Sequence, residues 1–481
     1  MSIDRDLSAS IAVTRFGLGA KPGEIAAARG DPAGYLRAQI RPAGADQPDG
    51  AFESAAQRIA DLRQFQAIRR EARQAQVQSG VPIDPKADAK DDPVKQARNL
   101  IRDDTGEEFL ARMRLAATTD AGFRERWALF WFNHFTVSAV KLQTAVVVGP
   151  FEREAIRPRV FDRFENLLVA STMHPAMLLY LDQAQSVGPD SRVAGMGRAG
   201  AQGPKRLNGL NENLAREVME LHTLGVGSGY TQADVTEFAR ALTGWSIVGP
   251  NEHPYAAGKT PGEFVFRPGF HEPGARRILG KTYAEGGIEQ AHAVLTDLAR
   301  HPATARHIAV KLARHFVADD PPPALTARLE ASFNASGGRL DALAATLIDS
   351  PEAWDPRQRK FKTPYEFLVS GYRAAGLAPG ELKQVAPVLT GLGQKPFSAP
   401  SPKGWDETAG DWAAPDGIVK RMSWSEAFAQ ATAPVAGQPL ELARNTLGAR
   451  LSPAVATAIA HAESRPEAFS ILLMSPEFQR R

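Results

Sequence analysis

Asn213, Glu217 and Glu220 stand out as side chains whose types and spacing could do chemistry together. They lie in NENLAREVMELHTLGVG (residues 211–227), where a helical period puts positions i, i+4 and i+7 on one face. Two carboxylates one turn apart, beside an amide, suit a divalent metal or a division of acid and base roles. Arg216 supports a second interpretation, because ordinary helix ion pairs would use the same carboxylates. The spacing alone favours neither.

His271 and Glu272 are the second group of candidates. They stand in PGFHEPGARR, a Pro- and Gly-flanked loop in which no core packing demands a histidine. We expect this loop to close on the 211–224 helix. The residues then predicted to be catalytic are Glu217, Glu220, His271 and Glu272, and those predicted to hold a divalent metal are Glu217, Glu220 and His271. The residues predicted to bind a substrate are Asn213, Arg216, Arg276 and Trp245.

Several polar residues are expected to be structural. His222 falls near the middle of the apolar face of its helix, and His134 shares a stripe with aromatic residues in FRERWALFWFNHF (residues 123–135). Asn133 and Arg126 lie on that second helix, which is otherwise apolar. A buried amide and guanidinium must find partners, and a carboxylate from the 211–224 helix is the natural one. The predicted structural polar core is therefore His134, Asn133, Arg126 and His222.

A basic stripe and several tryptophans complete the candidate residues. His307, Lys311 and Arg314 share one helical face, which is typical of a solvated surface but would also suit an anionic substrate or the acidic helix. Trp405 and Trp412 lie in the loop-like stretches SPKGWDE and DWAAPDG. Aromatic residues in such loops either stack on sugar rings or cover the edge of a helical core.

The elements that must position these residues are mostly helical. Residues 51–78 have few apolar positions and predict an exposed helix, whereas residues 123–135 are apolar on nearly every side and predict a central buried one. The predicted class is all-α, a multi-helical orthogonal assembly with a small β-hairpin insert around residues 262–284. The predicted organisation is a single domain over residues 1–481, with a β-containing insert at 246–286 and mobile loops at 79–95 and 186–209.

Composition excludes several classes of protein. The 481 residues are 43% apolar and 23% charged, as in an ordinary globular chain, and a net charge of +3 argues against a nucleic-acid binder. The lack of cysteine excludes disulfides, cysteine-ligated zinc and thiol catalysis. No apolar run suits a signal peptide or a transmembrane helix, so a cytoplasmic location is expected, with a periplasmic location or export together with a partner left open.

An ordered series of motifs spans the chain from Arg15 to Arg481. It comprises RFGLGA, FWFNHFTVS, HPAMLLYLD, NENLAREVMELHTLGV, HEPGARRILG, HPATARHIAVKLARHFVADDPP, FKTPYEF, SPKGWDE and SPEFQRR. The series resembles the bacterial domain-of-unknown-function 1800 family, which is uncharacterised. Many of its members are encoded beside sulfatase-like proteins of the domain-of-unknown-function 1501 family, so the resemblance implies such a partner. The family's loop usually reads His-Asp-x-Gly-x-Lys, and here Glu272 and Arg276 keep both charges.

Two functional hypotheses follow. The first is an acid/base or metal-assisted hydrolase or lyase that acts on an envelope or extracellular polymer, either anionic or carbohydrate. The second is a non-enzymatic binding or assembly partner of a sulfatase-like protein, which would dock through residues 51–78 and the basic stripe. Haem on His134 or His222 is a weaker third alternative. The cofactor is left open apart from the divalent metal.

Overall fold

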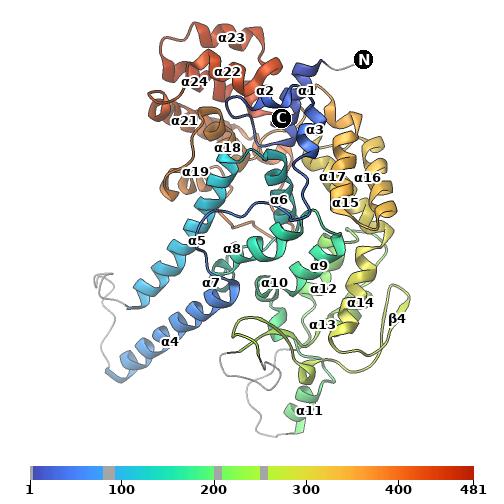
Figure 1. Ribbon diagram of the computed structural model, residues 1–481. Helices are drawn as coiled ribbons and strands as arrows, with labels where there is room; N and C mark the ends of the chain where they lie inside the picture. Colours follow the sequence, from blue (N-terminus) through green and yellow to red (C-terminus); the bar gives the residue numbers. More distant parts are fainter. Residues whose placement is uncertain (1–3, 80–92, 200–208, 250–257) are drawn as a thin grey trace.

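The computed structural model describes residues 4–79, 93–199, 209–249 and 258–481. The described residues form a mostly helical assembly with two small two-stranded sheets, which confirms the predicted all-α class with a β insert (Figure 1). Residues 80–92 and 200–208, within the predicted mobile loops, lie outside the described residues. Residues 192–199 of the second predicted loop instead form helix α11 (Arg192–Ala199).

Helix α6 (Gly122–His134) lies at the centre of the fold, as its apolar sequence predicts. The indoles of Trp127 and Trp131 are fully buried, and the Trp127 Nε1–H donates to the Val160 carbonyl oxygen at 2.7 Å. A single hydrophobic cluster extends from Ile11 near the N-terminus to Phe478 near the C-terminus. Shorter helices precede and follow α6 along the chain. They are α1 (Arg5–Ile11), α2 (Glu24–Ala28), α3 (Pro32–Arg37), α7 (Leu142–Ala145), α8 (Val148–Phe151), α9 (Phe164–Met173) and α10 (Pro175–Tyr180).

Helices α4 (Ala55–Ser79) and α5 (Pro93–Thr118) form an antiparallel pair whose far end extends away from the body (Figure 1). The first turns of α4 are anchored by Ile59, Leu62 and Phe65, which are buried. Beyond Phe65 the helix is largely exposed, and Val77 is 78% exposed. This matches the low apolar content of residues 51–78.

The helix predicted to carry chemistry is short and changes its winding. It consists of α12 (Asn213–Glu217), followed at once by a π-helical turn at Val218–His222. Such turns insert one extra residue into the helical register and shift the side chains that follow. Helix α13 (Gln232–Leu242) then begins with a capping box between Thr231 and Asp234.

The β insert consists of two separate antiparallel pairs. Strand β1 (Trp245–Ile247) pairs with β2 (Phe264–Phe266), and β3 (Arg276–Ile278) pairs with β4 (Lys281–Tyr283). The β3–β4 hairpin lies within the predicted range of 262–284. The β1–β2 pair joins residues that are distant in sequence, which a hairpin pattern does not reveal.

The C-terminal half is again helical. Its helices are α14 (Ile288–Ala299), α15 (Pro302–Phe316), α16 (Pro323–Ser336), α17 (Leu340–Asp349), α18 (Pro364–Ala375), α19 (Ala386–Gly391), α20 (Ala409–Trp412), α21 (Pro415–Thr432), α22 (Pro439–Leu447), α23 (Pro453–Ala460), α24 (Arg465–Met474) and α25 (Pro476–Gln479). The last residues return to the segment before α18, where Arg481 N donates to the Lys360 carbonyl at 2.9 Å and Phe361 forms a bridge with Arg480. This return brings the Arg481 side chain into the interior. Among the described helices, none is both long and apolar enough to cross a membrane.

Candidate functional site

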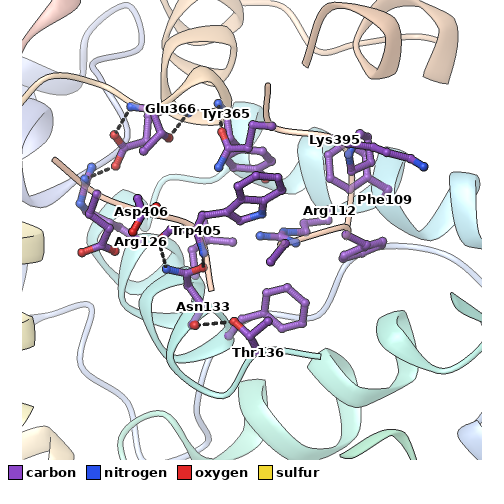
Figure 2. Close-up of a pocket in the computed structure, with 18 of the residues that line it drawn as sticks. Phe109, Arg112, Arg126, Asn133, Thr136, Tyr365, Glu366, Lys395, Trp405 and Asp406 are labelled. Carbon is purple, nitrogen blue, oxygen red and sulfur yellow. Dashed lines mark hydrogen bonds and ion pairs between the residues drawn. The ribbon is translucent and has the colours of Figure 1, made fainter. Parts of the chain in front are cut away.

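A cavity of about 90 Å³ lies where α5, α6, α15 and α18 meet the loop of residues 394–407. Figure 2 shows the side chains that surround it, including Arg112 from α5, Asn133 from α6, Tyr365 from α18 and Trp405 from the loop. At roughly 10–15 Å³ of such volume for each water, the cavity has room for about six to nine waters. A ligand group the size of one sugar ring is therefore the scale to consider.

His315 and Glu407 form a hydrogen-bonded pair in the wall of this cavity. The His315 Nδ1 lies 2.6 Å from Glu407 Oε1, and the Nε2 of the same ring has no hydrogen-bond partner among the described residues. Burial lowers the pKa of His315 to about 4. Burial would raise the pKa of Glu407, but His315, Lys360 and Lys311 together hold it at about 2. At neutral pH the pair is therefore a carboxylate and a neutral imidazole.

The hydrogen bond determines which imidazole nitrogen carries the proton. A carboxylate can only accept, so the Nδ1 of His315 must be the protonated nitrogen. The unpartnered Nε2 then carries a lone pair. A base held in one tautomer by an adjacent carboxylate is the arrangement that general-base catalysis uses.

Glu366 also lines the cavity. It is the N3 residue of the capping box that begins α18, in which Thr363 N donates to Glu366 Oε2 at 3.0 Å. Arg126 and Arg481 form ion pairs with its other oxygen, Oε1. Burial would raise the pKa of Glu366, but the two guanidinium groups outweigh it and hold that pKa well below its usual range. The expectation that Arg126 pairs with the 211–224 helix is therefore wrong.

Asn133 positions the loop that closes the cavity. Its side chain makes two hydrogen bonds to the backbone of Trp405, and not to the 211–224 helix as expected. Thr136 Oγ1 donates to the Asn133 carbonyl at 2.6 Å, which fixes the end of α6 (Figure 2). Trp405 and Trp412 are adjacent, with ring centres 6.1 Å apart, and the Trp412 indole N–H donates to the Asp406 carbonyl at 2.7 Å. Trp405 lines the cavity, whereas Trp412 does not.

The remaining predicted core histidines are buried beside α15. His134 and His222 are each 1% exposed, with ring centres 6.0 Å apart. His134 Nε2 donates to the His222 carbonyl at 3.1 Å, and His307 Nε2 donates to the Leu221 carbonyl at 3.0 Å. Carbonyls at a helix C-terminus lack partners within the helix, so the two imidazoles supply them.

The basic stripe on α15 is half-buried. His307 meets the end of the 211–224 helix, as described above, and Arg314 Nε donates to the Asp319 carbonyl at 3.2 Å. Burial lowers the pKa of Lys311 to about 8, and no ion pair of Lys311 occurs in the described part of the chain. The docking role of this stripe stays a prediction.

Glu217 and Glu220 lie near each other, as the helical spacing predicts. Burial and the neighbouring Glu220 raise the pKa of Glu217. Tyr230 donates its hydroxyl to Glu220 Oε2 at 3.2 Å. Arg216 takes Glu212 as its ion-pair partner, at 3.2 Å, instead of either predicted carboxylate, and Asn213 is exposed. A half-buried carboxylate with a raised pKa suits proton transfer, so the catalytic role of Glu217 stays a prediction.

The loop that carries His271 and Glu272 is fastened to the end of α13. His271 Nδ1 donates to the Thr243 carbonyl at 2.9 Å, and Glu272 N donates to Thr243 Oγ1 at 2.8 Å. Glu272 Oε2 accepts from the Asp190 backbone N–H at 2.7 Å. Burial lowers the pKa of His271. These contacts hold the insert in place and engage His271 Nδ1 and Glu272 Oε2. His271 Nε2 has no hydrogen-bond partner among the described residues, so the catalytic roles of His271 and Glu272 stay predictions.

The two residues predicted from the insert to bind substrate are also engaged inside the protein. Arg276 contacts Glu237 at 3.3 Å and the Gly274 carbonyl at 3.2 Å. Trp245 is fully buried against Phe264, with ring centres 5.4 Å apart. Within the described ranges, no group of three or more histidine and carboxylate side chains is placed to hold a metal ion. Glu217, Glu220 and His271 are thus not gathered into one metal site.

Comparison with protein-family models matches residues 11–480 to a family described as a protein of unknown function, DUF1800. The chain belongs to this family. The match covers the same span as the ordered motifs, so the predicted resemblance is confirmed. No curated protein and no solved structure matches the chain.

In this DUF1800 chain, the sequence alone does not single out His315 and Glu407. The two residues are 92 positions apart, and no local spacing connects them. The available signals are indirect. His315 continues the stripe of His307 and Lys311 by one further turn, and Glu407 follows Trp405 and Asp406 in SPKGWDE.

Proposed function

We propose that this chain is an acid/base enzyme, a hydrolase or a lyase, that acts on one ring-bearing unit of an envelope or extracellular polymer. The observation that carries the proposal is the His315–Glu407 pair, whose unpartnered Nε2 belongs to a side chain that lines the cavity. Concave sites with a few convergent polar groups and shifted pKa values are the usual places for such chemistry.

In this proposal His315 acts as the general base. Glu407 accepts the Nδ1 proton and keeps the ring in the tautomer whose Nε2 lone pair is free. In hydrolysis, Nε2 takes a proton from water as the water oxygen attacks, and the imidazolium returns that proton to the leaving oxygen. In elimination, Nε2 takes the proton from carbon and returns it to the departing oxygen. The Glu407 carboxylate stabilises the imidazolium in both cases.

The other cavity residues would hold the substrate. Trp405 presents an aromatic face, which suits the apolar face of a sugar ring, and Asn133 fixes its backbone. Stacking on a sugar ring is one of the two roles predicted for the tryptophan-bearing loops. The volume of the cavity matches one such ring and not a longer segment of polymer.

The test is a screen of acidic and neutral polysaccharides with the purified full-length chain, read as new reducing ends and as unsaturated chain ends. His315→Gln and Glu407→Gln should each lower the rate by about 100-fold or more, the usual contribution of general-base catalysis. His461→Gln is the matched control, because that histidine is exposed and lies outside the cavity. Unchanged turnover in His315→Gln would refute the assignment.

The pH profile gives a second check of the same assignment. The pKa of His315 is lowered to about 4, so its Nε2 stays unprotonated as the pH falls from 8 to 6. Turnover should therefore be nearly constant over that range. A loss centred at pH 6–7 would indicate a different base.

Glu217 is the alternative candidate for the general base. Its pKa is raised by burial and by Glu220, so Glu217→Gln removes a carboxylate that suits proton transfer while keeping its size. If Glu217→Gln abolishes turnover and His315→Gln does not, the active site lies on the 211–224 helix. The reverse result locates it in the cavity.

The extended α4–α5 pair favours the non-enzymatic alternative. The outer part of α4 is exposed and carries Arg69, Arg70 and Arg73 (Figure 1). Such a surface would suit the sulfatase-like partner that the family resemblance implies. Co-purification of the two proteins, lost when the three arginines are changed to glutamate and retained by His315→Gln, would support a docking role. Stable association of the triple variant would exclude this surface.

A further inference from the structure

Arg112 is a buried cation that lacks the hydrogen bonds it needs. Its only carboxylate contact in the described residues is Glu152, with Nη1 and Oε2 3.4 Å apart, and its Nε is buried there without a hydrogen-bond partner. Four aromatic rings surround the guanidinium, with ring centres 4.8 Å away for Phe132, 5.1 Å for Tyr365, 5.3 Å for Phe397 and 5.9 Å for Phe109. Aromatic faces stabilise the positive charge but accept no ordinary hydrogen bond.

The hydroxyl of Tyr365 is a second donor without an acceptor. It is buried and has no hydrogen-bond partner among the described residues. Tyr365 and Arg112 both line the cavity, and the guanidinium carbon lies 5.1 Å from the Tyr365 ring centre (Figure 2). A buried hydroxyl and a buried guanidinium that both lack acceptors are costly, unless a bound group supplies oxygen atoms.

Glu152 is only a partial counter-charge for Arg112. Arg157 donates to Glu152 Oε1 twice, from Nε at 2.9 Å and from Nη2 at 2.6 Å. The same Arg157 also donates twice to Glu125. Glu152 is therefore already engaged, and it reaches Arg112 only through Oε2 at a long distance.

The carboxylates that line the cavity each have a closer partner of their own. Glu366 is paired with Arg126, Glu407 with His315, and Asp406 with Lys403. Lys395 lies exposed among the lining residues, with no ion pair in the described part of the chain. The donors in the cavity thus lack a hydrogen-bond acceptor. Because Arg112 and Lys395 have no close counter-charge, a negatively charged acceptor is favoured.

Resting on the proposed function, we propose that Arg112 and Tyr365 bind the carboxylate of an acidic sugar unit, so that the substrate is a polymer of the uronic acid class. The planar guanidinium fork matches two carboxylate oxygens, and the Tyr365 hydroxyl donates to one of them. The sugar ring then lies against Trp405, with His315 in the cavity wall. The subsite selects the acidic unit, and the His315–Glu407 pair acts on it.

The test uses two matched pairs of small probes, glucuronate with glucose and acetate with acetamide, at constant ionic strength. Binding is measured by calorimetric titration and by the shift in thermal midpoint, since a ligand of the folded state raises that midpoint. We expect the wild-type chain to bind glucuronate and acetate, and to bind glucose and acetamide more weakly by about tenfold or more, the effect of losing one charged hydrogen-bonded contact.

Tyr365→Phe is the decisive variant. It removes only the hydroxyl, which has no partner in the described residues, so the fold should be unaffected while affinity for both acids falls by about tenfold. Tyr372→Phe is the matched control, because Tyr372 is also buried but does not line the cavity. Arg112→Met tests the guanidinium, with thermal unfolding run beside it because the Glu152 contact is also lost. His315→Gln should keep the binding.

The outcomes separate the subsite from the proposed function. If acetate binds and Tyr365→Phe weakens it, while glucuronate does not bind, then the carboxylate subsite stands and the sugar substrate fails. If glucose binds as well as glucuronate and Tyr365→Phe changes neither, then the subsite is refuted while a sugar-acting enzyme survives. If no probe binds, or acetamide binds as well as acetate, the subsite is refuted.

Discussion

Asn133 and Trp405 exchange two hydrogen bonds across 272 residues of sequence. The Asn133 Nδ2 donates to the Trp405 carbonyl at 3.0 Å, and the Trp405 backbone N–H donates to Asn133 Oδ1 at 2.8 Å. One amide side chain thus does what a neighbouring strand does in a sheet. It holds the 394–407 loop against the end of α6 and thereby forms one wall of the cavity.

Replacing this amide by a carboxylate should break half of the contact. In Asn133→Asp one oxygen still accepts from Trp405, but the other faces the Trp405 carbonyl and has no proton to donate. We expect the free energy of unfolding to fall by about 1–3 kcal/mol, measured by urea unfolding. Asn334→Asp, on the exposed side of α16, is the control and should have little effect. Equal stability of the two variants would contradict this role for Asn133.

Gly404 is required by the same contact. Its φ is +89°, and a Cβ there would lie 2.5 Å from the Asn133 carbonyl oxygen. Gly404→Ala should therefore displace the loop and lower the free energy of unfolding by about 1–3 kcal/mol. Gly410→Ala adds the same methyl group where the nearest atom, Thr408 Oγ1, is 3.7 Å away. Tryptophan fluorescence should change in the first variant only, and a change of equal size in the second would argue against a local effect.

Glu366 should be far more important for stability than a surface carboxylate in the same kind of pair. Glu366→Gln leaves Arg126 and Arg481 buried without their counter-charge, so we expect a loss of about 3–5 kcal/mol in the free energy of unfolding. Glu352→Gln breaks the more exposed pair with Arg328 and should cost about 1 kcal/mol or less. Chemical denaturation of the two variants side by side measures the difference. Similar losses would mean that the buried cluster contributes little.

Buried neutral histidines should make the fold sensitive to acid. Burial lowers the pKa of His222 to about 3, below its unfolded value of 6.5, so the unfolded chain binds a proton that the folded chain does not. The stability contribution of this histidine is present above pH 6.5 and is lost as the pH falls from 6.5 toward 3.

His222→Phe keeps a ring of similar size and removes the titration. In the middle of that window, the slope of unfolding free energy against pH should decrease by about 1.4 kcal/mol per pH unit. Urea unfolding at a series of pH values measures the slope. Above pH 7 the two curves should run parallel, because the histidine is neutral in both states. An unchanged slope at pH 4–6 would show that His222 is protonated in the folded protein.

The sequence was sufficient to predict a structural feature wherever the residues of one helix alone determine it. The apolar character of residues 123–135 predicted the buried α6. The placement of His134 and His222 in the core followed from helical period alone. The ordered motifs were enough for the family, since a series that spans the chain is far more specific than any one motif.

The partners of the buried charges were not predictable in this way. Arg126 was expected to meet a carboxylate from the 211–224 helix, but Glu366 and the C-terminal Arg481 join it instead. A buried guanidinium requires a partner, and its own sequence neighbours do not say which segment will supply one.

The sequence by itself determined the helical class, the central buried helix, the core histidines and the family of this protein. Only the tertiary structure decided where the cavity lies and which residues face it. Periodicity and capping are properties of residues within a few turns, and the sequence states them directly. The pairing of His315 with Glu407, and of Asn133 with Trp405, depends on how helices and loops far apart in the chain pack together. That packing is determined by the burial of the whole core and not by any local pattern.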